Sequence, residues 1–241
     1  MAEQPIQFKV FRYKQGQSVP AYQTFTVLVD ENTTVLVALQ EIRREQDPSL
    51  MLRHSCHHAS CGTCGMRVNG QEVLACVVKV LELGTPTVLV EPLANLPLIS
   101  DLVVDMNAFF GHYTPAGMPY VRTSEFLPQA VPPAGIDHFT RYENCLECGL
   151  CVSACPIAGS NSGYLGPAAL AAAQRVTAAG PQAEKAAVLD WVDSEHGCWR
   201  CHVAFECSEV CPSDVDPGGA IMSLRNQLTR RKFRRLLGRS S

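Results

Sequence analysis

Charged side chains are scarce in this chain. Asp, Glu, Lys and Arg make up 18% of its 241 residues, against about 25% in a typical soluble domain. The 20 basic and 23 acidic residues leave a net charge of −3, which excludes the strongly basic surface of a nucleic-acid binder and the acid excess of a disordered tail. Because 46% of the residues are hydrophobic, we expect partner subunits to cover part of the surface.

Two targeting features are also missing. Residues 1–14 mix acidic, amide and basic side chains where a signal peptide would have a charged start and an apolar stretch. The longest uncharged run, residues 148–174, contains Gly, Ser, Asn and internal Pro, which a lipid-exposed helix of about 20 apolar residues would not favour. We therefore expect a chain that is not exported and does not itself cross a membrane.

Cysteine, in contrast, is abundant and clustered. The 12 cysteines fall within residues 56–76, 145–155 and 198–211, and in a reducing compartment such clusters indicate metal or redox sites rather than disulfides. The gap between the first two clusters contains a Pro-rich segment, residues 114–135, typical of an extended connector. The gap predicts two domains, residues 1–106 and 107–241, which suits a chain of this length.

The two domains differ in their hydrophobic periodicity. Alternating apolar residues and an Asn69-Gly70 turn predict strands in the first domain, over residues 6–10, 25–29, 66–68, 73–75 and 87–90. A helix with apolar positions at Leu36, Leu39 and Ile42 is expected to begin after Asn32–Thr34 and to end before Asp47-Pro48. The second domain is predicted to be helical over residues 168–173, 183–191 and 220–228.

The first cysteine cluster has the spacing of a plant-type 2Fe-2S site, in which a tight loop is joined by one distant ligand. Its ligands would be Cys56, Cys61, Cys64 and Cys76. Gly62 and Gly65 would let the loop backbone approach the inorganic sulfides. A structural zinc site with four cysteines is the alternative, although such sites usually have two close Cys-x-x-Cys pairs. His57 and His58 lack the second half of a Rieske motif and are expected to be partly exposed.

The later clusters form a pair of bacterial ferredoxin motifs, in each of which the last cysteine binds the far cluster. In the second motif Ala204 occupies the place of one cysteine, so that site keeps three thiols, enough for a 3Fe-4S cluster. The spacing predicts 3Fe-4S ligation by Cys155, Cys201 and Cys207, and 4Fe-4S ligation by Cys145, Cys148, Cys151 and Cys211. The fold class is therefore α+β: an N-terminal β-grasp 2Fe-2S ferredoxin-like domain followed by an all-α ferredoxin-type domain.

Cys198 remains outside these sets. It precedes Cys201 by three residues, which is close to one helical turn. It can be a buried thiol that packs as a small hydrophobic group, or a fourth ligand that converts the trinuclear site into a cubane.

The order of the three clusters resembles that of the iron-sulfur subunit of succinate dehydrogenase and fumarate reductase. The resemblance includes Arg53-x-Ser55-Cys56, the segment Asp101–Met106, Gly166-Pro167-Ala168 and Ser208–Pro212. It implies that electrons pass between FAD on a flavoprotein subunit and quinone at a membrane anchor, through 2Fe-2S, 4Fe-4S and 3Fe-4S clusters. The dicarboxylate chemistry then belongs to the flavoprotein, and we assign no catalytic residue to this chain.

The resemblance also places a quinone site beside the 3Fe-4S cluster, with Pro156 and His202 lining it. His202 can equally be a hydrogen-bonded histidine on the surface of a helix. Ubiquinone-using dehydrogenases usually have a serine and two tryptophans soon after the Cys-Pro pair, whereas this chain has Ile157–Ser160, which favours menaquinone. The implied location is the cytoplasmic face of the cell membrane, as a peripheral subunit, and the anchor can carry haem.

Two further alternatives follow from the same residues. Soluble, thiol-linked fumarate reductases and other flavoprotein oxidoreductases use similar iron-sulfur chains, and ligand spacing does not indicate the direction of the reaction. The C-terminal stretch, residues 225–239, holds seven basic residues and no acid. It is either a solvated helix end or a contact with anionic lipid headgroups.

Overall fold

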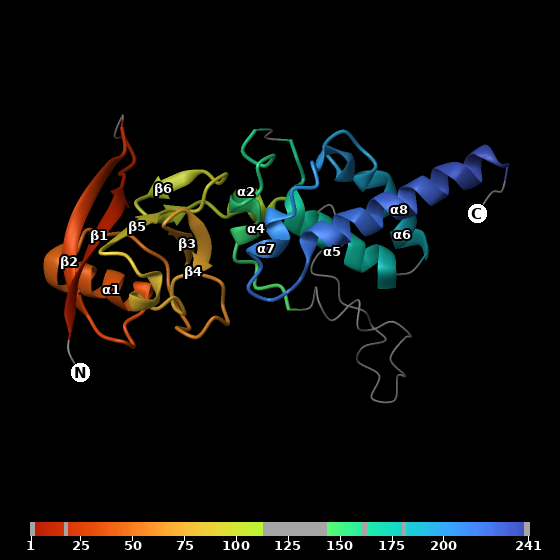
Figure 1. The fold of residues 1–241 in the computed structure, drawn as a ribbon. Coiled ribbons are helices and arrows are strands. Elements are labelled where there is room, and N and C mark those ends of the chain that lie inside the picture. The colour runs from red at the N-terminus through yellow and green to blue at the C-terminus, as the bar shows by residue number, and fades with distance from the viewer. Residues whose placement is uncertain (1–2, 17–18, 113–143, 161–162, 180–181, 239–241) are drawn as a thin grey trace, which may run out of the picture. The chain divides into compact units, whose positions relative to one another are not determined.

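The computed structural model describes residues 3–16, 19–112, 144–160, 163–179 and 182–238 (Figure 1). The chain divides into two compact units: unit 1 comprises Met1–Ala108 and Leu146–Ala154, and unit 2 comprises Phe109–Cys145 and Cys155–Ser241. The connector expected at residues 114–135 lies outside the described residues. The domain boundary after Met106 stays a prediction.

Unit 1 is built on a five-stranded mixed sheet with the strand order β2-β1-β5-β3-β4. The strands are β1 (Gln4–Arg12), β2 (Ala21–Val29), β3 (Gly65–Val68), β4 (Gln71–Leu74) and β5 (Thr87–Glu91). β1 and β5 are parallel, whereas the other neighbouring strands are antiparallel. The expected period-2 pattern is confirmed, since Ile6, Phe8 and Val10 are buried and the residues between them are exposed.

The helix that the sequence predicts packs against this sheet. α1 (Val35–Glu41) begins at Thr34, whose side chain accepts a hydrogen bond from the Val37 amide at 3.3 Å, and it continues as one π-helical segment, η1 (Ile42–Gln46). Leu36, Leu39 and Ile42 are fully buried. The expected β3–β4 hairpin turns at Asn69 and Gly70, both with positive φ (50° and 83°), which matches the twist of the flanking strands.

Short elements complete unit 1: η2 (Leu81–Leu83), the paired strands β6 (Leu98–Ser100) and β7 (Val103–Val104), and α4 (Leu150–Ser153). Asp101, in the turn between β6 and β7, is fully buried. Its carboxylate accepts hydrogen bonds from the Tyr13 and Met51 amides and forms ion pairs with Arg12 and Lys14. This carboxylate therefore ties the end of β1 to the chain that leads into the first cysteine loop.

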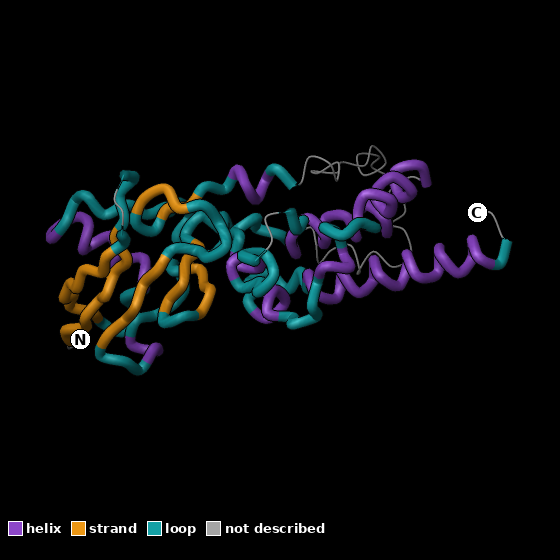
Figure 2. Tube along the Cα trace, turned by 90° about the horizontal axis from the view of Figure 1, so that it is seen from above, coloured by secondary structure: helices purple, strands orange, loops and turns teal. Residues whose placement is uncertain are grey.

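Unit 2 is helical (Figure 2). Its long helices are α5 (Gly166–Ala179), α6 (Gln182–Val192) and α8 (Pro217–Leu236), and its short ones are η5 (Cys198–Arg200) and α7 (Glu206–Glu209); α2 (Asn107–Phe110) lies at the junction of the two units. α5 packs against both α6 and α8. The shared core includes Leu170, Val192 and Leu224. The helices expected from the sequence are thus confirmed, and the fold is α+β.

Candidate iron-sulfur centres

The first cysteine loop, residues 56–64, curls so that backbone amides point at thiol sulfurs. The Ser60 amide lies 3.3 Å from Sγ of Cys56, and the Ala59 amide lies 3.3 Å from Sγ of Cys76. The hydroxyl of Thr63 lies 3.1 Å from Sγ of Cys61. Cys76, which follows β4, is thereby brought to the loop from a distant place in the sequence.

The curl depends on residues with positive φ. His57 (64°), Ala59 (56°) and Gly62 (70°) all have left-handed backbone angles, which are uncommon for residues other than glycine. His57 and His58 are exposed, as expected. The backbone amides of the loop therefore face the thiol sulfurs, whereas its two histidine side chains are exposed to solvent.

The thiols of this loop differ in acidity. The pKa of Cys56 is lowered to about 7, chiefly because the His58 amide donates to its sulfur. Burial raises the pKa of Cys64 to about 12. Cluster binding requires thiolates, so bound iron would have to offset the desolvation of Cys64. Amides directed at the sulfurs suit an anionic cluster, in which such donors stabilise the thiolate charge.

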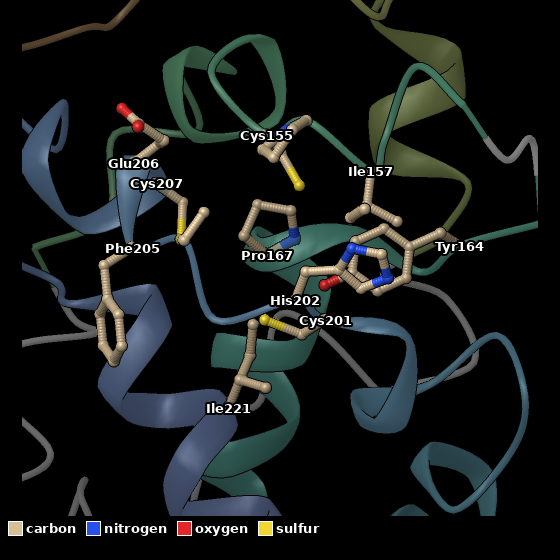
Figure 3. Close-up of a pocket in the computed structure, with 12 residues that line it drawn as sticks. Cys155, Ile157, Tyr164, Pro167, Cys201, His202, Phe205, Glu206, Cys207 and Ile221 are labelled. Carbon is tan, nitrogen blue, oxygen red and sulfur yellow. The ribbon is translucent and has the colours of Figure 1, made fainter.

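Three thiols of unit 2 line one small cavity (Figure 3). Cys155 comes from the turn after α4, Cys201 follows η5, and Cys207 lies in α7. Ala204 also lines this cavity, so the position where a fourth cysteine would stand in the ferredoxin motif carries no ligand. The donor set fits a cluster with three cysteine ligands, and burial raises the pKa of Cys155 and, to about 12, that of Cys207.

Tyr164 is a residue of this cavity that the sequence analysis missed. Tyr164 is 4% exposed, and its side chain lies beside Cys201 in the cavity (Figure 3). Burial first, and then the neighbouring thiols, raise the pKa of Tyr164, so the phenol stays protonated and able to donate. Its only sequence signal is an aromatic residue just before Gly166-Pro167.

Arg225 of α8 fixes the backbone that carries Cys201. Its guanidinium donates from Nε to the Cys198 carbonyl at 2.9 Å, and from Nη2 to the Trp199 carbonyl at 3.2 Å and the Cys201 carbonyl at 2.5 Å. The Trp199 ring lies near the cations of both Arg225 and Lys232. A helix without any candidate ligand thus positions one of the three thiols.

Cys198 is completely buried in the protein interior. It is 0% exposed and belongs to the apolar core of unit 2, and it is not among the residues that line the cavity of Cys155, Cys201 and Cys207. Burial raises its pKa to about 11. These observations favour a packing role.

The residues expected at the quinone site lie at the same cavity. Pro156 and His202 are both exposed on its lining, next to the Cys155 and Cys201 thiols respectively. The expected 4Fe-4S ligands are divided, because Cys148 and Cys151 belong to unit 1 whereas Cys145 and Cys211 belong to unit 2. That ligand set stays a prediction. Within the described part of the chain, no helix has both the length and the apolar composition for a membrane span.

Comparisons with known proteins agree with this geometry. Residues 7–111 match the family described as a 2Fe-2S iron-sulfur cluster binding domain, and residues 141–215 match the 4Fe-4S dicluster domain. Across the whole chain, the fold is similar to a chain of the Mycobacterium smegmatis Sdh1 complex in the apo form, with a TM-score of 0.78 and 21% identity over 96% of this chain and 98% of that one.

Curated relatives are similar in sequence along most of their length. The fumarate reductase iron-sulfur subunits of Haemophilus influenzae and Mycobacterium tuberculosis are 35% and 34% identical, over 92% and 96% of both chains. The mitochondrial succinate dehydrogenase [ubiquinone] iron-sulfur subunit of Dictyostelium discoideum is 32% identical over 91% of this chain and 81% of that protein. The chain therefore belongs to the family of iron-sulfur subunits of fumarate reductase and succinate dehydrogenase.

Proposed function

We propose that this chain carries single electrons between a flavoprotein subunit with bound FAD and a quinone at a membrane anchor. The observation that carries the proposal is the grouping of Cys155, Cys201 and Cys207 around one cavity whose fourth position is Ala204. A site with three thiols and an open corner suits a 3Fe-4S terminus of a relay that begins at the 2Fe-2S loop of unit 1. When bound, the clusters supply one-electron redox chemistry.

The residues of this chain hold and tune the electron carriers. Amides of the 56–64 loop stabilise thiolate charge at the first centre, and the buried phenol of Tyr164 lies beside Cys201 at the last one. Arg225 keeps the Cys201 backbone in place. The middle centre is assigned to Cys145, Cys148, Cys151 and Cys211 on the motif spacing.

A quinone site is proposed at the mouth of the unit 2 cavity. Pro156 and His202 line it from two different segments, so a quinone head group there would be close to the last centre. His202, as an exposed imidazole, can donate a hydrogen bond or a proton to a quinone oxygen. Menaquinone is favoured because the stretch Ile157–Ser160 after Cys155-Pro156 lacks the serine and two tryptophans that ubiquinone-using dehydrogenases usually have soon after this pair. We place the subunit on the cytoplasmic face of the membrane, bound to an anchor.

The test is to isolate the complex anaerobically, to measure iron and acid-labile sulfide, and to record electron paramagnetic resonance spectra before and after succinate. We expect an oxidised 3Fe-4S signal that is replaced, after succinate, by a reduced 2Fe-2S signal. Intact clusters that succinate does not reduce would assign the chain to a different flavoprotein partner. Purification without an anchor subunit would favour the soluble, thiol-linked reductase.

A further inference from the structure

We propose that Gly62 and Gly65 are positioning residues that set the distance between the first two electron carriers. They do so because their missing side chains let the backbone of the 2Fe-2S loop touch the backbone of the segment that carries Cys148. The inference rests on the proposed function, since it concerns the transfer of one electron from the 2Fe-2S to the 4Fe-4S cluster.

Gly62 lies against the Cys148 segment with no room for a side chain. A Cβ atom placed on Gly62 would be 2.6 Å from the carbonyl oxygen of Leu146, 2.9 Å from Cβ of Cys148 and 3.0 Å from its Cα. Two of these three atoms belong to the backbone, so no rotamer change could remove the clash. Gly62 follows Cys61, so the contact joins the neighbour of a proposed 2Fe-2S ligand to Cys148, a proposed 4Fe-4S ligand.

Gly65 makes the second close approach. A Cβ atom there would be 3.0 Å from the carbonyl oxygen of Cys148 and 3.3 Å from Cδ2 of Leu150. Gly65 also follows Cys64, so both glycines face the same short stretch of chain. Its φ is not positive, which means that backbone conformation does not explain the glycine at this position, whereas the approach of Cys148 does.

The far end of the Cys148 segment is also held against the rest of unit 1. Oγ of Ser153 accepts a hydrogen bond from the Ala94 amide at 2.8 Å and donates one to Glu72 at 3.0 Å. The side-chain amide of Asn95 donates to the carbonyls of Val152 and Ser153 at 3.0 and 2.9 Å. These contacts hold α4 against β4. The two glycines set the closest distance between the Cys148 segment and the 2Fe-2S loop.

Distance matters here because the overlap of donor and acceptor orbitals falls steeply with their separation. A displacement of the Cys148 segment by a few tenths of an ångström would leave both clusters and their ligands intact. It would nevertheless slow the step in which the 2Fe-2S cluster is oxidised and the 4Fe-4S cluster is reduced by one electron. No proton or bond is involved in that step.

The experiment uses the complete complex with the variant Gly65→Ala. Both clusters are reduced with dithionite, and their magnetic interaction is recorded by electron paramagnetic resonance. We expect a weaker spin-spin interaction and slower reoxidation of the 2Fe-2S cluster, with the reduction potentials of both clusters unchanged. Dithionite makes the magnetic measurement independent of succinate, so a failure of the proposed function would be seen separately, as absent reduction by succinate.

Gly62→Ala has a matched control in Gly70→Ala. Both glycines have a positive φ (70° and 83°), but a Cβ atom on Gly70 would meet nothing within 4 Å. Both variants carry the same backbone strain, and only Gly62→Ala should change the spin-spin interaction. An unchanged interaction and rate in a fully loaded Gly65→Ala complex would overturn the proposal.

If Gly65→Ala fails to retain the 2Fe-2S cluster, the variant Ser153→Ala tests the proposal instead. This change loosens the same segment from the far side without touching the cysteine loop, and we expect it to weaken the spin-spin interaction too. An undiminished interaction in Ser153→Ala, together with cluster loss in Gly65→Ala, would show that Gly65 serves the 2Fe-2S loop alone.

Discussion

Asp101→Asn should destabilise unit 1 by about 3 kcal/mol, a magnitude that follows from counting acceptors. Oδ1 of Asp101 accepts from the Tyr13 amide (2.9 Å) and Arg12 Nε (3.2 Å), and Oδ2 accepts from the Met51 amide (2.9 Å) and Lys14 Nζ (2.8 Å). Asparagine tolerates the backbone φ of 46° at this position. It has one side-chain oxygen, however, so the donors of one side lose their acceptor.

The energy of that loss can be bounded. A hydrogen bond to a charged group contributes about 1.5–3 kcal/mol, and two of them are removed. The Lys14 side chain is 40% exposed and can turn to water, which brings the expected cost to the lower end of the sum. The remaining penalty is dominated by the part-buried Met51 amide, which is left without an acceptor.

The same carboxylate should make unit 1 sensitive to acid. Burial alone would raise the pKa of Asp101, but the hydrogen bonds from Lys14 and the two amides, together with the charge of Arg12, outweigh it and hold the pKa below its usual value. The folded pKa is therefore lower than the unfolded one. Its stabilising contribution is complete above about pH 3.9 and is lost as the pH falls through the folded pKa.

The assay is thermal loss of the visible circular dichroism of the 2Fe-2S centre, in the complete complex and at one fixed scan rate, because cluster loss is irreversible. At neutral pH the expected shift is on the order of 10 °C downward. Asp105→Asn is the matched control, since its Oδ1 only accepts from the Asn107 amide, a role that asparagine fills equally well. Equal midpoints for the two variants would refute the reasoning.

Three further predictions concern unit 2. Cys198→Ala should cost about 1 kcal/mol of stability and leave the iron content and the oxidised 3Fe-4S signal unchanged; loss of that signal would make Cys198 a ligand. Tyr164→Phe removes only the buried phenol hydroxyl beside Cys201 and should lower the reduction potential of the 3Fe-4S centre in a titration; an unchanged potential would show that this hydroxyl does not tune the centre. Truncation after Gln227 removes the exposed Phe233 and a basic helix end, and should weaken membrane retention of the complex most at low salt, where the attraction to anionic headgroups is least screened; unchanged retention would mean a solvated helix end.

Local patterns made much of unit 1 predictable. Period-2 alternation, the Thr34 cap and the Asn69-Gly70 turn act within a few residues, and the sheet, α1 and the hairpin appear where these signals predict them. The role of Asp101 was not predictable in this way. Its partners lie 50 residues away at Met51 and 88 at Tyr13, so only the folded chain brings them together.

The residues of the candidate sites were likewise only partly predictable from the sequence. Cysteine spacing grouped Cys155, Cys201 and Cys207, because ferredoxin motifs encode the exchange of ligands between sites. Tyr164 and Arg225 have no such spacing signal, and their contacts depend on how α5 and α8 pack around the cavity. The packing of the Cys148 segment on Gly62 was equally unpredictable from the sequence, because the conformation of the cysteine loop already accounts for a glycine at this position.

The three hydrogen bonds from Arg225 have a consequence for the order of biosynthesis. Domains fold as their chains emerge during synthesis, and Cys201 emerges before α8 does. Until Arg225 has been added, the carbonyls of Cys198, Trp199 and Cys201 lack their donor. The last thiol site is thus completed only after α8 has been synthesised, and iron and sulfide are expected to enter unit 2 after that point.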